Sequence, residues 1–185
     1  MLLKKEILIP DNVTIENLNN FLTLKGPLGY VILKKKSYIT VSYDKISKKI
    51  LLTYKKNNIS KKIESFEKNF YDFNIQLNRS LKSVSFNFFL QLKLVGIGYR
   101  FISFTDNVLT LRVGFCNIIE FKIPTNVKVI LQNATLITLY SNDLLCLKQV
   151  STSLKKVRFL DNYKGKGILY LNENPSLKES NKKQL

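Results

Sequence analysis

A seven-residue segment occurs twice in the chain, and this repeat constrains the fold more than any other feature. "IPDNVTI" begins at Ile9 and "IPTNVKV" begins at Ile123, with four identities in seven positions and a separation of 114 residues. Because proline cannot donate to a β-ladder, each copy indicates the start of a strand or the edge of a sheet. "LTLKGPLGYV" from Leu22 and "LITLYSNDLL" from Leu136 follow the two copies at the same interval, which argues against chance similarity. We therefore predict two domains of one design.

Short apolar runs and turn residues alternate through the first half of the chain. Short strands are predicted at residues 13–15, 22–25 and 31–34. Residues 38–41 and 50–54 alternate apolar with polar side chains, as half-buried strands do, and are predicted to be strands as well. "GPLG" at residues 26–29 is expected to form a turn, since Pro favours the second turn position and Gly permits positive φ. "KKNNISKK" from Lys55 is predicted to be a charged loop or an insertion.

Each set of strands is followed by a segment with helical periodicity. In the first segment, apolar side chains recur at intervals of three and four and are expected to face the core: Phe70, Phe73, Leu77, Leu81, Val84 and Phe88. The second helix is predicted from about Asp143 to Val157, with Leu147, Val150, Leu154 and Val157 as its buried stripe. Asn142 is expected to cap this helix, and Asp143 and Asp161 are interpreted as local capping residues at a helix start and a turn.

The second half of the chain has its own set of apolar runs. An antiparallel sheet is predicted from residues 90–104, 107–115, 118–124 and 127–133, with a hairpin turn at Asp106 and Asn107. "GIG" at residues 96–98 lies within a strand pattern, where glycine indicates a bulge or a close approach. A final strand is predicted to end at Tyr170, and the polar segment after it is expected to be mobile until it is bound.

These patterns predict the α+β class, with two tandem duplicated domains. Each domain is expected to be a small antiparallel or mixed sheet with one helix packed on one face. The expected bounds are residues 1–84 for the first domain, with a divergent Lys-rich segment at 55–69, residues 85–171 for the second, and 172–185 for a polar basic tail.

The net charge of the chain indicates a polyanionic partner. Its 185 residues contain 30 Lys and Arg against 13 Asp and Glu, a net charge of +17. Such an excess makes the compact state repel itself, so it is typical of chains that bind a polyanion, although solvated charged faces would be the simpler explanation. Nucleic acid is favoured over a membrane, because no apolar run reaches 18 residues. We expect no membrane insertion and no homo-oligomer.

Residue types that support catalysis or metal binding are scarce. His is absent, which removes the commonest general base and metal ligand, and the acidic residues are scattered. The two cysteines, Cys116 and Cys146, do not form a CxxC pair, so a zinc site is not expected. We therefore predict no enzymatic activity, no metal and no cofactor.

"YKGKG" at residues 163–167 is the strongest candidate binding motif. If the segment were a strand, Lys164 and Lys166 would point to one face, and Gly165 and Gly167 would leave the other face open to a second backbone. Lysine suits phosphate oxygens, and Tyr163 could stack on an unpaired base. The simpler explanation is a glycine-rich loop with solvated lysines.

Three further basic residues lie on or just after the preceding helix, away from its buried stripe. They are Lys148, Lys155 and Arg158, and they could extend the same basic surface. The predicted RNA-binding set is therefore Tyr163, Lys164, Gly165, Lys166, Gly167, Arg158, Lys155 and Lys148.

In their order and spacing, the motifs resemble those of the family of the sixth protein of the large ribosomal subunit, in its bacterial form. The resemblance covers residues from about Ile7 to Tyr170, and its strongest parts are "LVGIGYR" at 94–100, "LTLRVGF" at 109–115, "IPTNV" at 123–127 and "RFLDNYKGKGILY" at 158–170. It implies a two-domain rRNA-binding protein whose second domain makes most rRNA contacts, near the sarcin-ricin region where translational GTPases dock. Large-subunit rRNA, neighbouring ribosomal proteins and, transiently, those GTPases are the implied partners.

Composition suggests where such a protein would be made. Asn, Ile, Lys, Phe, Leu and Tyr are heavily used and only four residues are Arg, which is typical of A+T-rich coding. The N-terminal segment does not resemble an Arg- and Ser-rich transit peptide, as expected for a protein encoded in an organelle. We expect a mitochondrially encoded protein of the matrix and its ribosome, with a plastid-type organelle or an A+T-rich bacterial cytoplasm as alternatives.

Two other classes of function remain open from the sequence. A nucleic-acid-processing enzyme or chaperone outside the ribosome would use the same charge, and a protein-interaction module would bind an acidic partner through its lysines. The scarcity of catalytic residue types argues against the enzyme.

Overall fold

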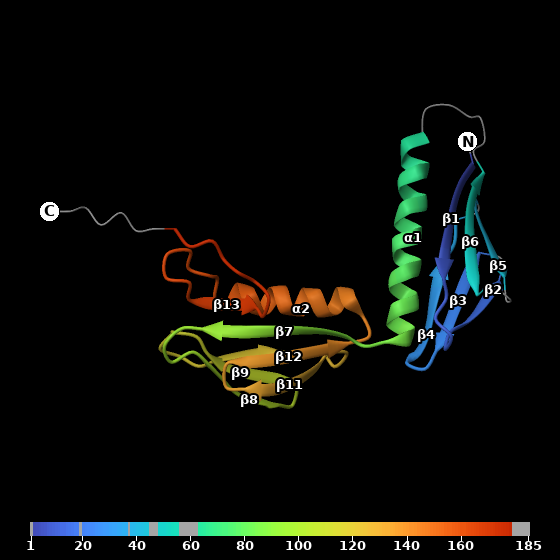
Figure 1. The fold of residues 1–185 in the computed structure, drawn as a ribbon. Coiled ribbons are helices and arrows are strands. Elements are labelled where there is room, and N and C mark those ends of the chain that lie inside the picture. The colour runs from blue at the N-terminus through green and yellow to red at the C-terminus, as the bar shows by residue number, and fades with distance from the viewer. Residues whose placement is uncertain (1, 19, 37, 45–47, 56–62, 179–185) are drawn as a thin grey trace. The chain divides into compact units, whose positions relative to one another are not determined.

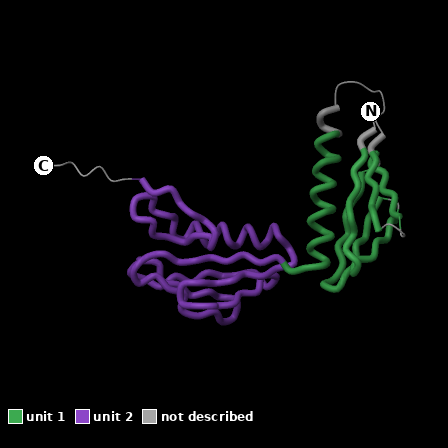
Figure 2. Tube along the Cα trace, in the orientation of Figure 1, with its two compact units in different colours: residues 1–87 green, residues 88–185 purple. Residues whose placement is uncertain are grey.

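The computed structural model describes residues 2–18, 20–36, 38–44, 48–55 and 63–178 of the chain. The chain divides into two compact units, unit 1 at residues 1–87 and unit 2 at residues 88–185 (Figure 2). Each unit contains antiparallel sheets and one α-helix (Figure 1), so the predicted α+β class with a duplicated sheet-and-helix pattern is confirmed. In the described residues each unit has two sheets, whereas we had expected one.

Unit 1 is built from two three-stranded antiparallel sheets. Their strand orders are β1-β6-β5 and β2-β3-β4. The strands are β1 (Leu2–Leu8), β2 (Thr14–Leu18), β3 (Phe21–Gly26), β4 (Gly29–Lys34), β5 (Ile39–Asp44) and β6 (Lys49–Lys55). Their alternating burial, as in Leu22 and Leu24 of β3, follows the period of two in the sequence.

The helix of unit 1, α1 (Ile63–Ser85), packs on β3 and β4. The predicted stripe is buried from Phe70 to Val84. Phe88 was wrongly assigned to it, because the helix ends at Ser85 and Phe88 begins the next strand. The Lys-rich segment that we predicted at 55–69 is helical from Ile63, and residues 56–62 lie outside the described residues.

Unit 2 contains a four-stranded and a three-stranded antiparallel sheet. The strand orders are β11-β12-β7-β13 and β10-β9-β8. The strands are β7 (Phe88–Val95), β8 (Arg100–Thr105), β9 (Val108–Arg112), β10 (Ile119–Lys122), β11 (Lys128–Asn133), β12 (Leu136–Ser141) and β13 (Gly167–Tyr170). The helix α2 (Leu144–Val157) contacts β7, β12 and β13 of the larger sheet (Figure 1).

The buried stripe of α2 is confirmed, but its cap differs from the prediction. Leu147, Val150 and Leu154 are buried, and Val157 packs against the same core. The N-cap is Asp143, whose Oδ1 accepts a hydrogen bond of 2.8 Å from the amide of Leu145. Asn142 precedes the cap, so the expectation that it caps the helix was wrong, and the interpretation of Asp143 as a capping residue is confirmed.

The sequence repeat corresponds to a repeated turn and hairpin. The amide of Val13 donates to the carbonyl of Pro10 at 3.1 Å, and that of Val127 donates to Pro124 at 3.0 Å. In each copy the turn leads into a hairpin, β2–β3 or β11–β12, whose second strand contacts the helix of its unit.

The two hairpins do not stay in phase along their whole length. Thr14 pairs with Lys25 in unit 1, whereas Lys128 pairs with Tyr140 in unit 2, one residue later than the repeat interval predicts. A register shift between Leu131 and Asn133 accounts for the extra residue. The structurally equivalent core residues are therefore Leu24 of β3 and Leu139 of β12, which are both fully buried.

Two turns depend on residues that tolerate positive φ. Asp106 and Asn107 have φ values of 50° and 61°, which confirms the predicted hairpin turn between β8 and β9. Gly98, with φ of 77°, lies in a turn that connects β7 to β8. The expectation that "GIG" lies within a strand was wrong, because the chain leaves one sheet of unit 2 at this point and enters the other.

The described part of the C-terminal tail packs on unit 2. The amide of Leu171 donates to the carbonyl of Gln91 at 3.0 Å, and the amide of Lys178 donates to Asn162 at 2.9 Å. The expectation of a mobile tail therefore does not hold through residue 178, because these hydrogen bonds and an ion pair of Glu173 tie the segment down.

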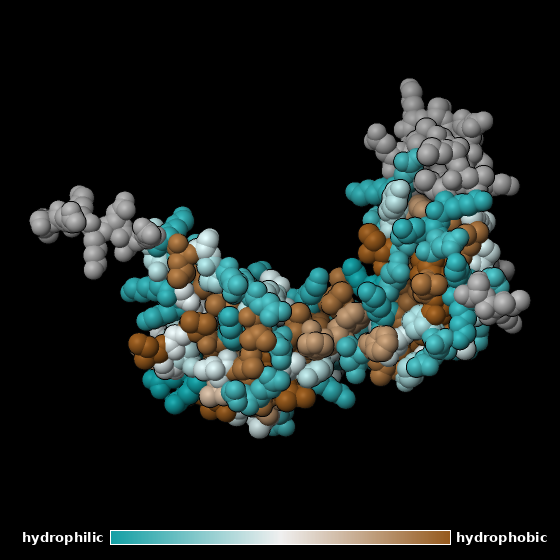
Figure 3. Space-filling view, viewed as in Figure 1, coloured by the Kyte–Doolittle hydropathy of each residue, from teal (hydrophilic) through white to brown (hydrophobic). Residues whose placement is uncertain are grey.

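Apolar and hydrophilic side chains are interspersed on the face of each unit that Figure 3 displays. No helix among the described residues is both long enough and apolar enough to cross a membrane.

Candidate nucleic-acid interface

The segment between α2 and β13 is a closed turn, and the strand predicted for "YKGKG" begins only at Gly167. The amide of Asp161 donates to the carbonyl of Lys166 at 2.9 Å, and the amide of Gly165 donates to the carbonyl of Asp161 at 2.7 Å. Oδ1 of Asp161 also accepts from the amide of Tyr163 at 2.9 Å, which confirms its predicted role as a local cap. We call residues 161–167 the lysine–glycine turn.

The two glycines of this turn serve different purposes. Gly165 has φ of 67°, a conformation that side-chain-bearing residues rarely adopt. A Cβ on Gly167 would lie 2.8 Å from Cα of Leu160 and 2.9 Å from the carbonyl oxygen of Phe159. The prediction that a second backbone approaches a glycine here is confirmed for Gly167, and the approaching backbone belongs to the chain itself.

The polar side chains of the turn do not share one strand face as we had expected, because residues 162–164 turn sharply. Lys164 is exposed and Lys166 is partly buried. Tyr163 is 59% exposed, so its side chain is accessible to a ligand. Lys164 and Lys166 form no ion pair with a carboxylate in the described part of the chain.

Arg158 connects the turn to the smaller sheet of unit 2. Its Cζ lies 5.0 Å from the centroid of the Phe115 ring, which is a cation–π contact. Its carbonyl accepts a hydrogen bond of 3.4 Å from the amide of Ile168 at the start of β13. The guanidinium therefore lies against the segment that follows β9, while the backbone of Arg158 is bonded to the start of β13.

Lys155 has an intramolecular partner. Its Nζ lies 2.5 Å from Oε2 of Glu173 and 4.4 Å from the ring centroid of Tyr170. Burial raises the pKa of the Glu173 carboxyl, but hydrogen bonds from Lys155 and the Tyr170 amide and the charges of Lys155 and Lys93 outweigh it, so the pKa lies below its ordinary value of 4.5. The tail is thereby anchored beside the lysine–glycine turn.

Lys148 is the predicted residue most remote from the turn along the chain. It is exposed on α2, seven residues before Lys155, which is about 10 Å along the helix axis. The structure thus brings Arg158 together with residues 163–167, places Lys155 beside the tail, and leaves Lys148 on the exposed surface of the helix.

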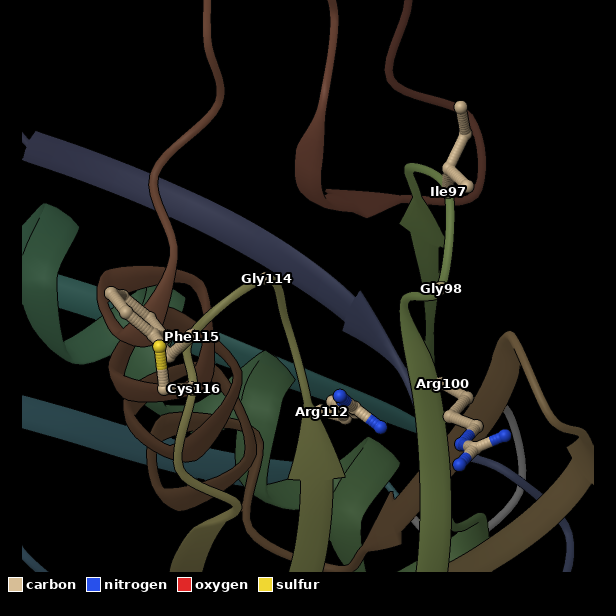
Figure 4. Close-up of a pocket in the computed structure, with 7 residues that line it drawn as sticks. All are labelled: Ile97, Gly98, Arg100, Arg112, Gly114, Phe115 and Cys116. Carbon is tan, nitrogen blue, oxygen red and sulfur yellow. The ribbon is translucent and has the colours of Figure 1, made fainter.

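Two arginines that we had not assigned to a site also lie on the surface of unit 2. Arg100 of β8 and Arg112 of β9 are directly paired across the hairpin, and both are exposed. They line a hollow with Ile97, Gly98, Gly114, Phe115 and Cys116 (Figure 4). Their rarity in the sequence, as two of only four arginines, was the signal that could have identified them.

Clusters that could hold a metal ion are not found in the described residues, where no three His, Cys, Asp or Glu side chains come together. Cys116 is exposed, Cys146 is partly buried, and both are free thiols.

The sequence is similar along most of its length to bacterial proteins named large ribosomal subunit protein uL6. It is 34% identical over 167 residues to that of Mycoplasmoides gallisepticum, covering 90% of this chain and 88% of the relative. It is 31% identical over 180 residues to that of Nitrosospira multiformis, with 97% of each chain covered, and 30% identical over 181 residues to that of Thermosipho africanus, with 96% of each covered. No protein-family model matches the chain.

Proposed function

This chain belongs to the uL6 family of large ribosomal subunit proteins, and we propose that it is a structural constituent of the large subunit that binds large-subunit rRNA through unit 2. Membership in this family means that the chain is not an enzyme. The observation that carries the rRNA proposal is the lysine–glycine turn, in which two lysines without a carboxylate partner among the described residues lie beside an exposed tyrosine.

The turn offers three kinds of contact to RNA. Lys164 and Lys166 can bind phosphate oxygens as flexible point charges. Tyr163 can stack on an unpaired base, since every base has a π-face. The backbone of the turn is fixed by the hydrogen bonds of Asp161 and by the packing of Gly167 against Leu160, so the backbone loses little conformational entropy on binding.

The other members of the predicted set have different roles in this proposal. Arg158 and Lys148 extend the basic surface, because neither forms an ion pair with a described carboxylate. Lys155 positions the tail, since its ammonium is already bound by Glu173. The tail in turn packs against the turn, where the side chain of Leu177 lies beside Gly165.

Unit 1 has an exposed apolar surface that supports contact with neighbouring ribosomal proteins. Leu18 pairs with Phe21 across β2 and β3, and these side chains are 63% and 47% exposed. On β4, Tyr30 and Ile32 are 69% and 56% exposed. Clustered exposed apolar side chains are typical of protein contacts, so protein binding is the second function proposed, and it is confined to unit 1.

The resemblance of the sequence to the family supports a finer location. We propose that unit 2 binds near the sarcin-ricin region, where translational GTPases dock transiently. The A+T-biased composition supports a mitochondrial ribosome as the site of action, although the relatives described above are bacterial, and an A+T-rich bacterial cytoplasm or a plastid is the alternative.

Sucrose-gradient fractionation tests this function directly. Source cells and their purified organelles are fractionated at low and at high salt, and each fraction is probed for this chain. We expect co-sedimentation with large subunits at both salt concentrations, and the fraction of origin identifies the compartment. Migration as a free small protein under both conditions would contradict the proposal.

A further inference from the structure

A basic hollow on unit 2 lies outside the surface that the sequence predicts. It has a volume of about 490 Å³ and is formed by the turn between β7 and β8 and by the end of β9 with the segment that follows. Figure 4 shows Arg100 and Arg112 on neighbouring strands; the side chain of Arg112 extends toward the strand of Arg100, and that of Arg100 lies on the other side of its own strand in this view. Ile97 is at the tip of the turn and is 91% exposed.

The arginine pair results from a bulge in the hairpin. Thr105 pairs with Val108, Phe104 with Leu109 and Ser103 with Thr110, but Phe101 pairs with Leu111 because the register shifts by one residue at Ile102. Without this shift, Arg100 would lie opposite Val113. With it, Arg100 lies opposite Arg112 on the exposed face, while Phe101 and Leu111 face the core.

Two like charges at directly opposed positions destabilise an antiparallel pair. Neither arginine forms an ion pair with a carboxylate of the described residues. Glu120 of β10 pairs with Thr110, two positions from Arg112, but it also forms no such ion pair. Two exposed arginines at paired positions, neither with a carboxylate partner among the described residues, therefore leave positive charge on this surface that a bound anion would offset.

The remaining walls of the hollow offer apolar surface and open space to a base. The Phe115 ring is 41% exposed and is oriented by Arg158. Gly98 has φ of 77°, and the space where its Cβ would project is open for at least 4 Å. The hollow thus combines two arginines at paired strand positions, whose guanidinium groups can bind phosphate oxygens bidentately, with apolar surface from Ile97 and Phe115.

We propose that Arg100 and Arg112 form a clamp for one phosphate of an unpaired nucleotide in RNA, whose base packs on the apolar wall of the hollow. The inference rests on the proposed function, because it takes RNA as the ligand of unit 2, and it adds a site that is separate from the lysine–glycine turn. Arg158 lies near both sites, because its guanidinium contacts Phe115 and its carbonyl accepts a hydrogen bond from the amide of Ile168, directly after the lysine–glycine turn. A paired nucleotide has its base enclosed in the duplex, so the clamp discriminates in favour of single-stranded RNA.

Binding of the purified full-length chain to a short single-stranded RNA and to an RNA duplex of the same length tests the clamp. We expect Arg100→Gln combined with Arg112→Gln to weaken binding of the single strand about 10-fold at low salt. The slope of the logarithm of the binding constant against the logarithm of the salt concentration, called the salt slope below, should fall in magnitude by about one unit. Duplex binding is expected to fall less. Arg112→Lys keeps the charge but loses the planar fork, so we expect an intermediate loss for the single strand alone.

Two controls separate the clamp from general charge and from misfolding. Lys122→Gln removes a positive charge from β10 of the same sheet, outside the hollow. It is expected to weaken binding to the single strand and to the duplex slightly and by the same factor. Thermal unfolding of the Arg100→Gln and Arg112→Gln protein should show a midpoint unchanged or raised by about 1–3 °C, because the repulsion is removed. A lowered midpoint would show that the arginines stabilise the fold, contrary to the proposal.

The outcomes distinguish the clamp from the function on which it rests. The clamp proposal is wrong, and the proposed function is unaffected, if the unaltered protein binds RNA and the double variant binds it equally well. The same conclusion follows if the double variant loses affinity for both RNAs only to the extent that Lys122→Gln does. If the unaltered protein binds neither RNA at low salt, both are wrong. Loss of binding to polyglutamate, with RNA binding intact, would assign the arginines to an acidic protein.

Discussion

Units 1 and 2 share a proline turn, a hairpin and a packed helix, but they differ in how many of their lysines form ion pairs with carboxylates in the described part of the chain. Three of the four ion pairs in the described residues lie in unit 1, where Lys25, Lys48 and Lys49 bind Glu16, Asp11 and Glu6. Unit 2 has one such pair, between Lys155 and Glu173. Similar architectures thus differ in how many of their lysines already have a carboxylate partner among the described residues, three in unit 1 and one in unit 2.

The largest effect is expected from removing equivalent core side chains. Leu24→Ala in unit 1 and Leu139→Ala in unit 2 each delete a fully buried side chain, so each should lower the free energy of unfolding of its own unit by about 2–5 kcal/mol. Hydrogen exchange resolved by residue would measure both units in each variant. Equal destabilisation of both units by either substitution would show that they unfold together.

Glycine substitutions in the two units should lower the free energy of unfolding by different amounts, and by less than the leucine substitutions do. Gly167→Ala in unit 2 places a Cβ 2.8 Å from the backbone of Leu160, at a φ of 153°. Gly29→Ala in unit 1, at a φ of 130°, meets no atom within 4 Å. We expect a loss of about 2–3 kcal/mol for Gly167→Ala and about 1 kcal/mol for Gly29→Ala. Equal losses in urea unfolding would mean that backbone strain alone, without the close approach, sets both values.

Matched lysine pairs test the difference in charge directly. Lys164→Ala with Lys166→Ala should weaken binding to large-subunit rRNA and lower the salt slope by about 1–2 units, since both ammonium groups are available to phosphates. Lys48→Ala with Lys49→Ala removes the same charge from lysines that already have carboxylate partners, so the slope should change little. Filter binding over a series of salt concentrations measures both, and equal slopes would remove the distinction between the units.

The smallest effect concerns the carboxylates of the two units. The pKa of Glu173 lies below 4.5, and hydrogen bonding and charge from Lys48 hold the pKa of Asp11 below 3.8. Both carboxylates stabilise the fold when ionised, so this stability is fully present above these ordinary values and is lost as pH falls through the lowered pKa. The free energy of unfolding should fall less steeply at acidic pH in Glu173→Gln than in the unaltered protein. The difference should be less than about 1 kcal/mol, since solvent partly screens the ion pair.

The matched variant for that measurement is Asp11→Asn, whose carboxylate is fully exposed, and its curve should change less than that of Glu173→Gln. The reverse order would show that the ion pair at Lys155 does not anchor the tail of unit 2.

Features controlled by neighbouring residues were predictable from the sequence. Asp106 and Asn107 tolerate positive φ, so their hairpin turn could be placed, and the spacing of Leu147, Val150 and Leu154 identified the buried side of α2. The repeat predicted that a strand starts or a sheet edge lies near Pro10 and Pro124, because proline cannot donate to a β-ladder, and β2 and β11 begin shortly after them. Errors occurred at the ends of elements, as at Phe88, where an apolar residue satisfies helical and strand patterns equally.

Contacts between distant segments could not be predicted in this way. Residues 163–166 have the alternation of a strand, yet they belong to a turn, because Gly165 and Lys166 form their backbone hydrogen bonds with Asp161 instead of with a neighbouring strand. The pairing of Arg100 with Arg112 depends on one bulged residue, Ile102, and the hairpin turn alone predicts the other register. Local conformational preferences selected the strands, helices and turns, whereas packing of Phe101 and Leu111 into the core favoured the bulge, and the bulge placed the two arginines together.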